Sequence, residues 1–291
     1  MEYTYFMGCQ IPARLNNCDL SIRNAAETLG IEMSDLEGAG CCGYPLRSLD
    51  SKATVLMASR NIALADKMHR DVMVVCNSCY STLTEVKNLL KEEPKLLEEA
   101  NEALGREGLH YEGTTRIKHI LQVLYHNCGI NKIDAQIKRR FEGLNVAVHY
   151  GCHILRPSEN LSFDDPEIPH ILDELVEMTG AKSVYWPLKL WCCGATTLPF
   201  DEKLGMKLID MKLKDARNAG AHCMVTTCPS CQISFDILQP RTARIHGEQY
   251  NIPVLYYPQL LGLALGLSPK EVGLGMNRVS AEPILQFLRE T

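Results

Sequence analysis

The chain has 291 residues, of which 46% are hydrophobic, and it carries a formal net charge of −5. This length predicts two domains with ordinary cores, and the acidic balance argues against nucleic acid or an anionic membrane surface as a partner. The longest apolar stretch, 252–267, contains two prolines and is shorter than the roughly 20 residues that cross a bilayer. The N-terminus lacks the charged start and long apolar run of a signal peptide. We therefore expect a cytoplasmic protein without a membrane span.

The first part of the chain alternates predicted strands and helices. A strand over 4–8 leads to Cys9, and the helix after it can be capped by Asp19 or Ser21 and ends at Gly30. A second helix over about 51–69 feeds a buried strand at 72–75. The charged stretch 85–113 has no counterpart later in the chain. It predicts a solvated helical excursion, with a partner contact as a further use.

The same order of elements returns in the second part. A strand over 145–151 leads to Cys152, and Asp165 with Pro166 starts a helix that carries Ile168 among its apolar residues and ends at Gly180. A helix over 201–218 then feeds a strand at 224–227. The last segment, 280–290, predicts an amphipathic helix that docks a partner or packs on its own domain.

Alternation of strands and helices predicts parallel sheets. The expected fold class is α/β, with two pseudo-symmetric Rossmann-like α/β domains, each with a parallel sheet. The repeat places the first domain at 1–141 and the second at 142–291.

Ten of the 13 cysteines form two copies of one pattern, each with a glycine after an adjacent cysteine pair. The first set is Cys9, Cys41, Cys42, Cys76 and Cys79, and the second is Cys152, Cys192, Cys193, Cys228 and Cys231. Five thiols exceed what a tetrahedral zinc or a cubane cluster takes. Cysteines that follow parallel strands lie at the ligand-binding edge of a sheet. Each set therefore predicts a polynuclear metal site at that edge.

Two other interpretations of the cysteines are weaker. Five disulfides would suit a secreted protein, whereas thiols in the cytosol stay reduced. Thioredoxin-like dithiols at Cys76-x2-Cys79 or Cys228-x2-Cys231 would leave the other cysteines of the sets idle. The remaining Cys18, Cys128 and Cys223 break the repeat, and we interpret them as packed or surface thiols.

The repeated pattern C-x31-C-C-G-x32-C-x2-C resembles the duplicated cysteine-rich CCG-domain pair of the B-type subunits of heterodisulfide reductase. Related subunits of lactate, glycolate and thiol-dependent fumarate oxidoreductases share it. The resemblance covers almost the whole chain. No Cys-x2-Cys-x2-Cys-x3-Cys-Pro run of the cubane-binding kind is present. The carrier of cubane clusters is therefore expected to be a separate subunit.

The resemblance implies a catalytic subunit that reduces the mixed disulfide of coenzyme M and coenzyme B in methanogenesis. Each cysteine set would hold one noncubane [4Fe-4S] iron-sulfur cluster. Implied partners are a cubane iron-sulfur subunit of the C type and a flavin electron-bifurcating subunit of the A type, with a hydrogenase or formate dehydrogenase as a further source of electrons. The alternative is an iron-sulfur electron-relay subunit of a lactate, glycolate or fumarate oxidoreductase complex.

Four further residues are candidates near the cysteines. His153 could give a proton to a departing thiolate, or could be a hydrogen-bonded loop histidine. Arg47, Arg156 and Lys189 could bind anionic groups of a substrate, or could be surface charges. If two clusters share one small-molecule disulfide, the two halves must face each other across it.

Overall fold

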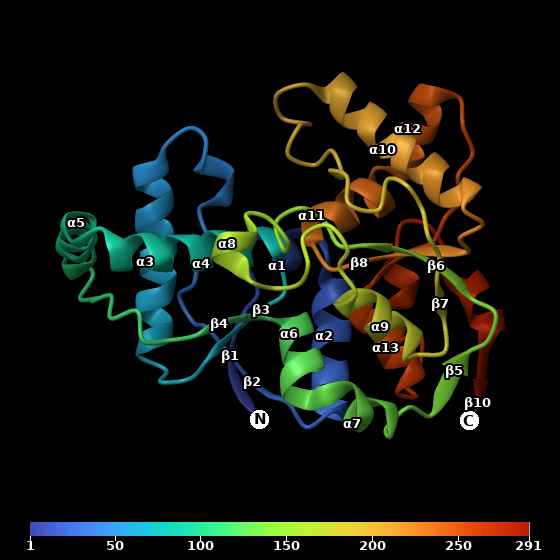
Figure 1. Ribbon diagram of the computed structural model, residues 1–291, viewed down its shortest axis with the longest axis horizontal. Coiled ribbons are helices and arrows are strands. Elements are labelled where there is room, and N and C mark those ends of the chain that lie inside the picture. Colours follow the sequence, from blue (N-terminus) through green and yellow to red (C-terminus); the bar gives the residue numbers. More distant parts are fainter. Residues whose placement is uncertain (291) are drawn as a thin grey trace.

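The computed structural model describes residues 1–290, which form two four-stranded parallel sheets (Figure 1). In the first sheet the strand order is β2-β1-β3-β4, with β1 at Glu2–Phe6, β2 at Glu32–Asp35, β3 at Val72–Val74 and β4 at Ile117–His119. In the second sheet the order is β7-β6-β8-β9, with β6 at Asn145–His149, β7 at Lys182–Ser183, β8 at Cys223–Thr226 and β9 at Val254–Tyr256. The two orders match strand for strand.

The central strands have the burial pattern of a parallel sheet. Helices cover both faces of such a sheet, so its inner strands are continuous apolar runs, and every residue of β3 and β8 is buried. All pairs within both sheets are parallel. The predicted α/β class with two Rossmann-like units is confirmed.

The helices of the first half follow the predicted order. They are α1 at Gln10–Arg14, α2 at Asn16–Thr28, α3 at Ser51–Asp66, α4 at Asn77–Glu92, α5 at Pro94–Gly105, α6 at Ile120–Gln122 and α7 at Ile130–Asp134. A π-helical turn at Val123–Gly129 joins α6 to α7. The charged excursion is helical as expected: α4 runs into it, and α5 buries Ala100 and Leu104.

The start of α2 was predicted wrongly. The helix begins at Asn16, and neither Asp19 nor Ser21 caps it. Asp19 instead accepts a hydrogen bond from the Tyr5 hydroxyl and forms an ion pair with Arg23, so its carboxylate is not free to cap.

The helices of the second half repeat this arrangement. They are α8 at Ser158–Leu161, α9 at Ile171–Glu177, α10 at Glu202–Asn218, α11 at Pro229–Gln232, α12 at Gln239–His246 and α13 at Tyr257–Ala264. A π-helical turn at Ile233–Ile237 follows α11.

The helix expected from Asp165 starts only at Ile171. The Asp165 carboxylate accepts hydrogen bonds from the backbone N–H groups of Glu167 and Ile168, which closes a local turn. Ile168 therefore lies outside the helix that was predicted to carry it, and its side chain is 80% exposed. Asp164 accepts from the N–H of Ile171 and satisfies the true start of the helix.

The C-terminal segment is not an amphipathic α-helix. It forms a 3-10 helix at Glu282–Phe287 and then β10 at Leu288–Glu290. This strand pairs antiparallel with β5, Arg139–Phe141, and the pair lies at one edge of the molecule (Figure 1). Ile284 is buried, so the segment packs on the chain itself.

Contacts between the halves hold the two sheets in a fixed relation. Helix α2 of the first half packs along α13 of the second (Figure 1). The Tyr256 hydroxyl donates to the carbonyls of Val75 and Thr227, the residues directly after β3 and β8. The carboxyl ends of β3 and β8 consequently lie next to each other. Within residues 1–290, no helix is long and apolar enough to cross a membrane.

Candidate metal centres

The first cysteine set surrounds one hollow at the carboxyl edge of the first sheet. Its five members line the hollow together: Cys9, Cys41, Cys42, Cys76 and Cys79. The hollow has about 370 Å³ of space, part of it open to solvent, and Cys9 is exposed. The spacing in the sequence thus predicted a real cluster of side chains.

The second set does the same at the edge of the second sheet. Its members are Cys152, Cys192, Cys193, Cys228 and Cys231, around a hollow of about 280 Å³. The three cysteines outside the repeat are all buried and line neither hollow. Burial raises the pKa of Cys223 to about 12, as expected for a packed thiol.

The glycine after each cysteine pair is required by the backbone. Gly43 and Gly194 have φ angles of +91° and +81°, which side chains disfavour. A Cβ atom on Gly194 would lie 2.6 Å from the carbonyl oxygen of Gly205. Each glycine therefore lets the pair turn back toward the hollow against the following long helix.

Helix N-termini lie under both sets. Helix α4 begins directly after Cys76 and α11 directly after Cys228, so each Cys-x2-Cys pair occupies a first helical turn. The pKa of Cys228 is lowered by hydrogen bonds from Cys231 and Cys76, and also by the backbone N–H groups of Cys231 and Ser230. Free N–H groups and the helix dipole favour negative charge at this place.

Hydrogen bonds between the thiols of each set lower the pKa of one cysteine and raise the pKa of its neighbours. Hydrogen bonds from Cys42 and Cys9 lower the pKa of Cys41 to about 2, and those from Cys152 and Cys193 lower the pKa of Cys192. The same contact with Cys41 raises the pKa of Cys42 to about 12. Five thiols so close together can ionise jointly only around a cation, because thiolates repel one another. The donor set therefore fits a polynuclear metal centre.

The two sites share a wall. Cys228 raises the pKa of Cys76 and Cys76 lowers the pKa of Cys228, so these two thiols, one in each hollow, are neighbours across the halves. Ser78 and Ser230, which follow them at the same place in the repeat, line both hollows. The two cysteine sets therefore lie beside each other at the carboxyl ends of β3 and β8.

His153 lies between the halves. Its Nδ1 is 3.0 Å from Cys152 Sγ, and its Nε2 is 2.9 Å from the hydroxyl oxygen of Tyr44, which follows the first Cys-Cys-Gly turn. A thiolate can only accept, so when Cys152 is a ligand the ring donates from Nδ1 and accepts from Tyr44 at Nε2. Burial lowers the pKa of His153, and the ring is neutral at neutral pH.

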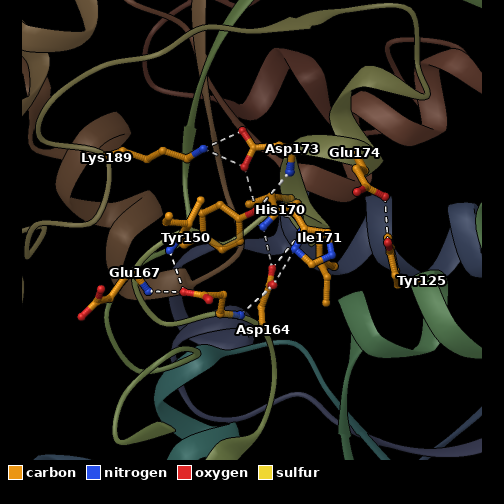
Figure 2. A network of polar contacts seen from close by, with 12 residues as sticks. Tyr125, Tyr150, Asp164, Glu167, His170, Ile171, Asp173, Glu174 and Lys189 are labelled. Carbon is orange, nitrogen blue, oxygen red and sulfur yellow. Dashed lines mark hydrogen bonds and ion pairs between the residues drawn. The ribbon is translucent and has the colours of Figure 1, made fainter.

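The three candidate cations are engaged elsewhere. Arg47 forms a 2.7 Å ion pair with Glu85, and Arg156 donates to the Pro166 carbonyl. Figure 2 shows Lys189 directed at Asp173, 2.6 Å away, within a polar network around Tyr150 and α9. None of the three lines either hollow.

Two polar residues beside the second set were missed by the sequence analysis. His149 ends β6, is fully buried and has Nε2 3.3 Å from Cys231 Sγ. Lys212 on α10 is 1% exposed and donates to the carbonyl of Trp191, next to Cys192. A signal was available for Lys212, because it falls on the buried helical face with Ile209, Leu213 and Ala216.

Comparison with known proteins agrees with this geometry. The model of the family described as "CCG: Cysteine-rich domain" matches the chain twice, over residues 3–84 and 146–236. The B-type subunit of a ferredoxin/F(420)H(2)-dependent CoB-CoM heterodisulfide reductase of Methanosarcina acetivorans is 39% identical over 96% of this chain and 94% of its own. The chain belongs to the family of duplicated CCG-domain proteins formed by the B-type subunits of heterodisulfide reductase.

Other relatives show the breadth of this family. The "8-methylmenaquinol:fumarate reductase membrane anchor subunit" of Wolinella succinogenes is 34% identical over 96% of this chain and 98% of its own. A hypothetical protein from Helicobacter pylori of known structure has a TM-score of 0.78 at 17% identity, and the match covers 96% of this chain and 52% of that one. The latter shows the fold alone. Family membership and the ten cysteines together indicate an iron-sulfur protein whose relatives are subunits of reductases.

Proposed function

We propose that this chain is the catalytic iron-sulfur subunit of a heterodisulfide reductase, in which each cysteine set holds a noncubane [4Fe-4S] cluster. Its substrate would be the mixed disulfide of coenzyme M and coenzyme B. The observation that supports this best is that Ser78 and Ser230, just after Cys76 and Cys228, line both hollows, so the two five-thiol sites are neighbours.

Reduction of a disulfide takes two electrons and two protons, breaks the S–S bond and gives two thiols. When bound, the two centres supply one electron each and iron as a Lewis acid for sulfur. The chain positions the substrate between the hollows, where Ser78 and Ser230 border both sites. We propose His153 as the proton donor to a departing thiolate: the ring gives up its Nδ1 proton as Nε2 takes one from the Tyr44 hydroxyl, and Tyr44 regains its proton from solvent.

The partners of this function would be separate subunits. Electrons would come from a cubane iron-sulfur subunit of the C type and a flavin electron-bifurcating subunit of the A type, in the cytoplasm, with a hydrogenase or formate dehydrogenase further upstream. The relatives named above are reductase subunits, which supports an assembly of this general kind.

The first test is metal content and activity. Protein purified without oxygen should carry about eight irons per chain, four in each set. It should oxidise a reduced viologen dye when given the mixed disulfide. Zinc in place of iron, or dye oxidation that does not depend on the disulfide, would refute the proposal.

The second test addresses the shared site. Binding of the disulfide or of a thiol product should perturb the paramagnetic resonance signals of both centres. Loss of either set, by Cys42→Ser or Cys193→Ser, should abolish disulfide reduction, because one electron alone leaves a thiyl radical. A response of one signal only would rule out the paired site while leaving the family intact.

A second candidate function is an electron-relay subunit of a lactate, glycolate or fumarate oxidoreductase complex. The full-length similarity to the fumarate reductase subunit of Wolinella succinogenes favours it. In a relay, the chain would copurify with a flavin oxidoreductase subunit. Dye oxidation would then require fumarate, or dye reduction would require lactate or glycolate, and the disulfide would have no effect.

A further inference from the structure

The two cysteine sets match, but the buried side chain that donates hydrogen bonds to each Cys-Cys loop differs between the halves. Asp50 and Asp201 cap α3 and α10 in the same way, each accepting from a backbone N–H in the first turn. Counted from these caps, Asn61 and Lys212 stand at the same position of the repeat. Both are buried, with 2% and 1% of their surface exposed.

In the first half, the side chain that holds the Cys-Cys loop is the uncharged amide of Asn61. Its amide nitrogen donates to the carbonyl of Cys41 over 3.0 Å, and its amide oxygen accepts from the N–H of Gly40 over 2.9 Å. The nitrogen also donates to Met57 on α3. Every polar atom of this side chain is used, and no charge is added to the first site.

In the second half, the side chain that holds the Cys-Cys loop is the charged ammonium of Lys212. Its ammonium donates to the carbonyls of Leu188 and Trp191, the latter over 3.0 Å, and lies 4.5 Å from the centre of the Trp186 ring. No carboxylate forms an ion pair with it among residues 1–290. The negative groups that act on it are the ionised thiols of Cys193, Cys231 and Cys192 and, after them, the carboxylate of Asp215. Burial lowers the pKa of Lys212 to about 8, so it is mainly protonated at pH 7.

A buried cation without an anion is costly, and an anionic centre between the thiols would compensate it. The reverse also holds: a fixed positive charge close to a metal centre in a weakly screening interior stabilises each electron added there. Net charge and hydrogen bonding around the sulfurs are known to set the potentials of iron-sulfur centres. The two sites, equal in their thiols, are thus unequal in the charge next to them.

We propose that Lys212 holds the reduction potential of the centre in the second cysteine set above that of the centre in the first, an inference that rests on the proposed iron-sulfur sites. The first electron to enter the pair then resides in the second site. The second electron fills the first site, next to Asn61.

The test is a redox titration of the iron-loaded chain, reduced stepwise with dithionite and followed by paramagnetic resonance. Two midpoints are expected. Lys212→Asn installs the residue of the first half. It should lower the more positive midpoint by about 59 mV or more, which is a factor of ten in the equilibrium constant for one-electron reduction. The other midpoint should not move, and Lys212→Arg, which keeps the charge, should restore the original value.

The reciprocal variant tests the same idea in the other site. Asn61→Lys should raise the more negative midpoint, and it keeps the proposal testable if Lys212→Asn does not retain iron. His149 and His153 are further polar differences at the thiols, since Phe6 and Gln10 stand at their positions in the first half. His149→Phe and His153→Gln are therefore each titrated alone, so that their effects are separated from that of Lys212.

The outcomes distinguish this inference from the proposed function. Unchanged midpoints in iron-loaded Lys212→Asn and Asn61→Lys would overturn the role of Lys212, whether or not the chain reduces the disulfide. Shifted midpoints in a chain that ignores the disulfide would support Lys212 and refute the substrate. Wild-type protein without iron would overturn both.

Discussion

At the scale of single residues, the glycine after each cysteine pair is the most constrained position. Gly194→Ala would place a Cβ atom 2.6 Å from the Gly205 carbonyl at a φ of +81°. We expect it to displace Cys193 and to lower bound iron by about half, since one of two four-iron sites is affected. Metal analysis of the anaerobic protein measures this.

Gly220→Ala is the matched control for this substitution. Gly220 also has a positive φ, +73°, but nothing lies within 4 Å of its Cβ position. It should cost about 1 kcal/mol of stability from backbone strain and leave iron unchanged. Equal iron loss from both variants would show that strain, and not the contact at Gly205, controls the site.

A second residue-scale prediction separates the two kinds of cysteine. Cys18→Ser and Cys223→Ser should leave iron content unchanged, because both thiols are buried away from the hollows. Cys42→Ser and Cys193→Ser should lower it. The same iron loss from all four variants would contradict the division of the cysteines into ligands and packed thiols.

The residue scale also shows what the sequence could predict. The ten cysteines were found because their spacing repeats, and the structure brings each five together. His149 and Lys212 escaped because a lone histidine in a strand or lysine in a helix has many ordinary uses. Arg47 and Lys189 were singled out for closeness in sequence, but their ion pairs depend on Glu85 and Asp173, which the fold alone brings near.

At the scale of elements, the π-helical turn after α11 carries a buried carboxyl group. Asp236 accepts hydrogen bonds from the backbone N–H groups of Arg278 and Val279 and is 1% exposed. Burial raises the pKa of Asp236 from 3.8 to about 6. The folded chain thus binds this proton more tightly than the unfolded chain, and the ionised group destabilises the fold above pH 6.

Stability due to Asp236 should therefore rise as the pH falls from about 7 to 4. The gain is at most about 3 kcal/mol, from 1.36 kcal/mol per pKa unit. Urea unfolding of wild type and Asp236→Asn at several pH values measures it as the difference between the two chains. A difference that stays constant over this range would show that Asp236 titrates normally.

Element boundaries were predicted less well than element order. The helix expected at Asp165 starts at Ile171, because two adjacent aspartates both accept backbone hydrogen bonds and only the first satisfies the helix. The C-terminal segment has the apolar spacing of a helix, yet its last residues pair with β5. A partner strand far along the chain leaves no mark on the local pattern.

At the scale of the whole molecule, one hydroxyl group joins the two sheets behind the sites. Tyr256 donates to Val75 of the first half and Thr227 of the second. Tyr256→Phe leaves both carbonyls without this donor and should lower the free energy of unfolding by about 1–3 kcal/mol. Denaturant unfolding with iron content held equal is the measurement.

Tyr257→Phe provides the comparison for that result. Its hydroxyl donates to Leu175, within the second half alone. It should cost less, about 1 kcal/mol. If the two variants are equally destabilised, the bond between the halves has no special weight. No local pattern in the sequence shows that the two halves lie against each other, because contacts such as that of Asn77 with Tyr150 join distant segments. Only the idea that two centres share one disulfide suggested it.

The contact between Cys76 and Cys228 has a consequence for the history of such a chain. These residues hold the same place in the repeat, and equivalent residues touch each other where a twofold axis passes between identical subunits. In a dimer of identical halves, every substitution would appear in both sites at once. One gene that encodes both halves is free of that rule, and a lysine can stand in one site while an asparagine stays in the other. Because the two halves are fused in one chain, the two centres can differ, and electrons can enter them in a fixed order.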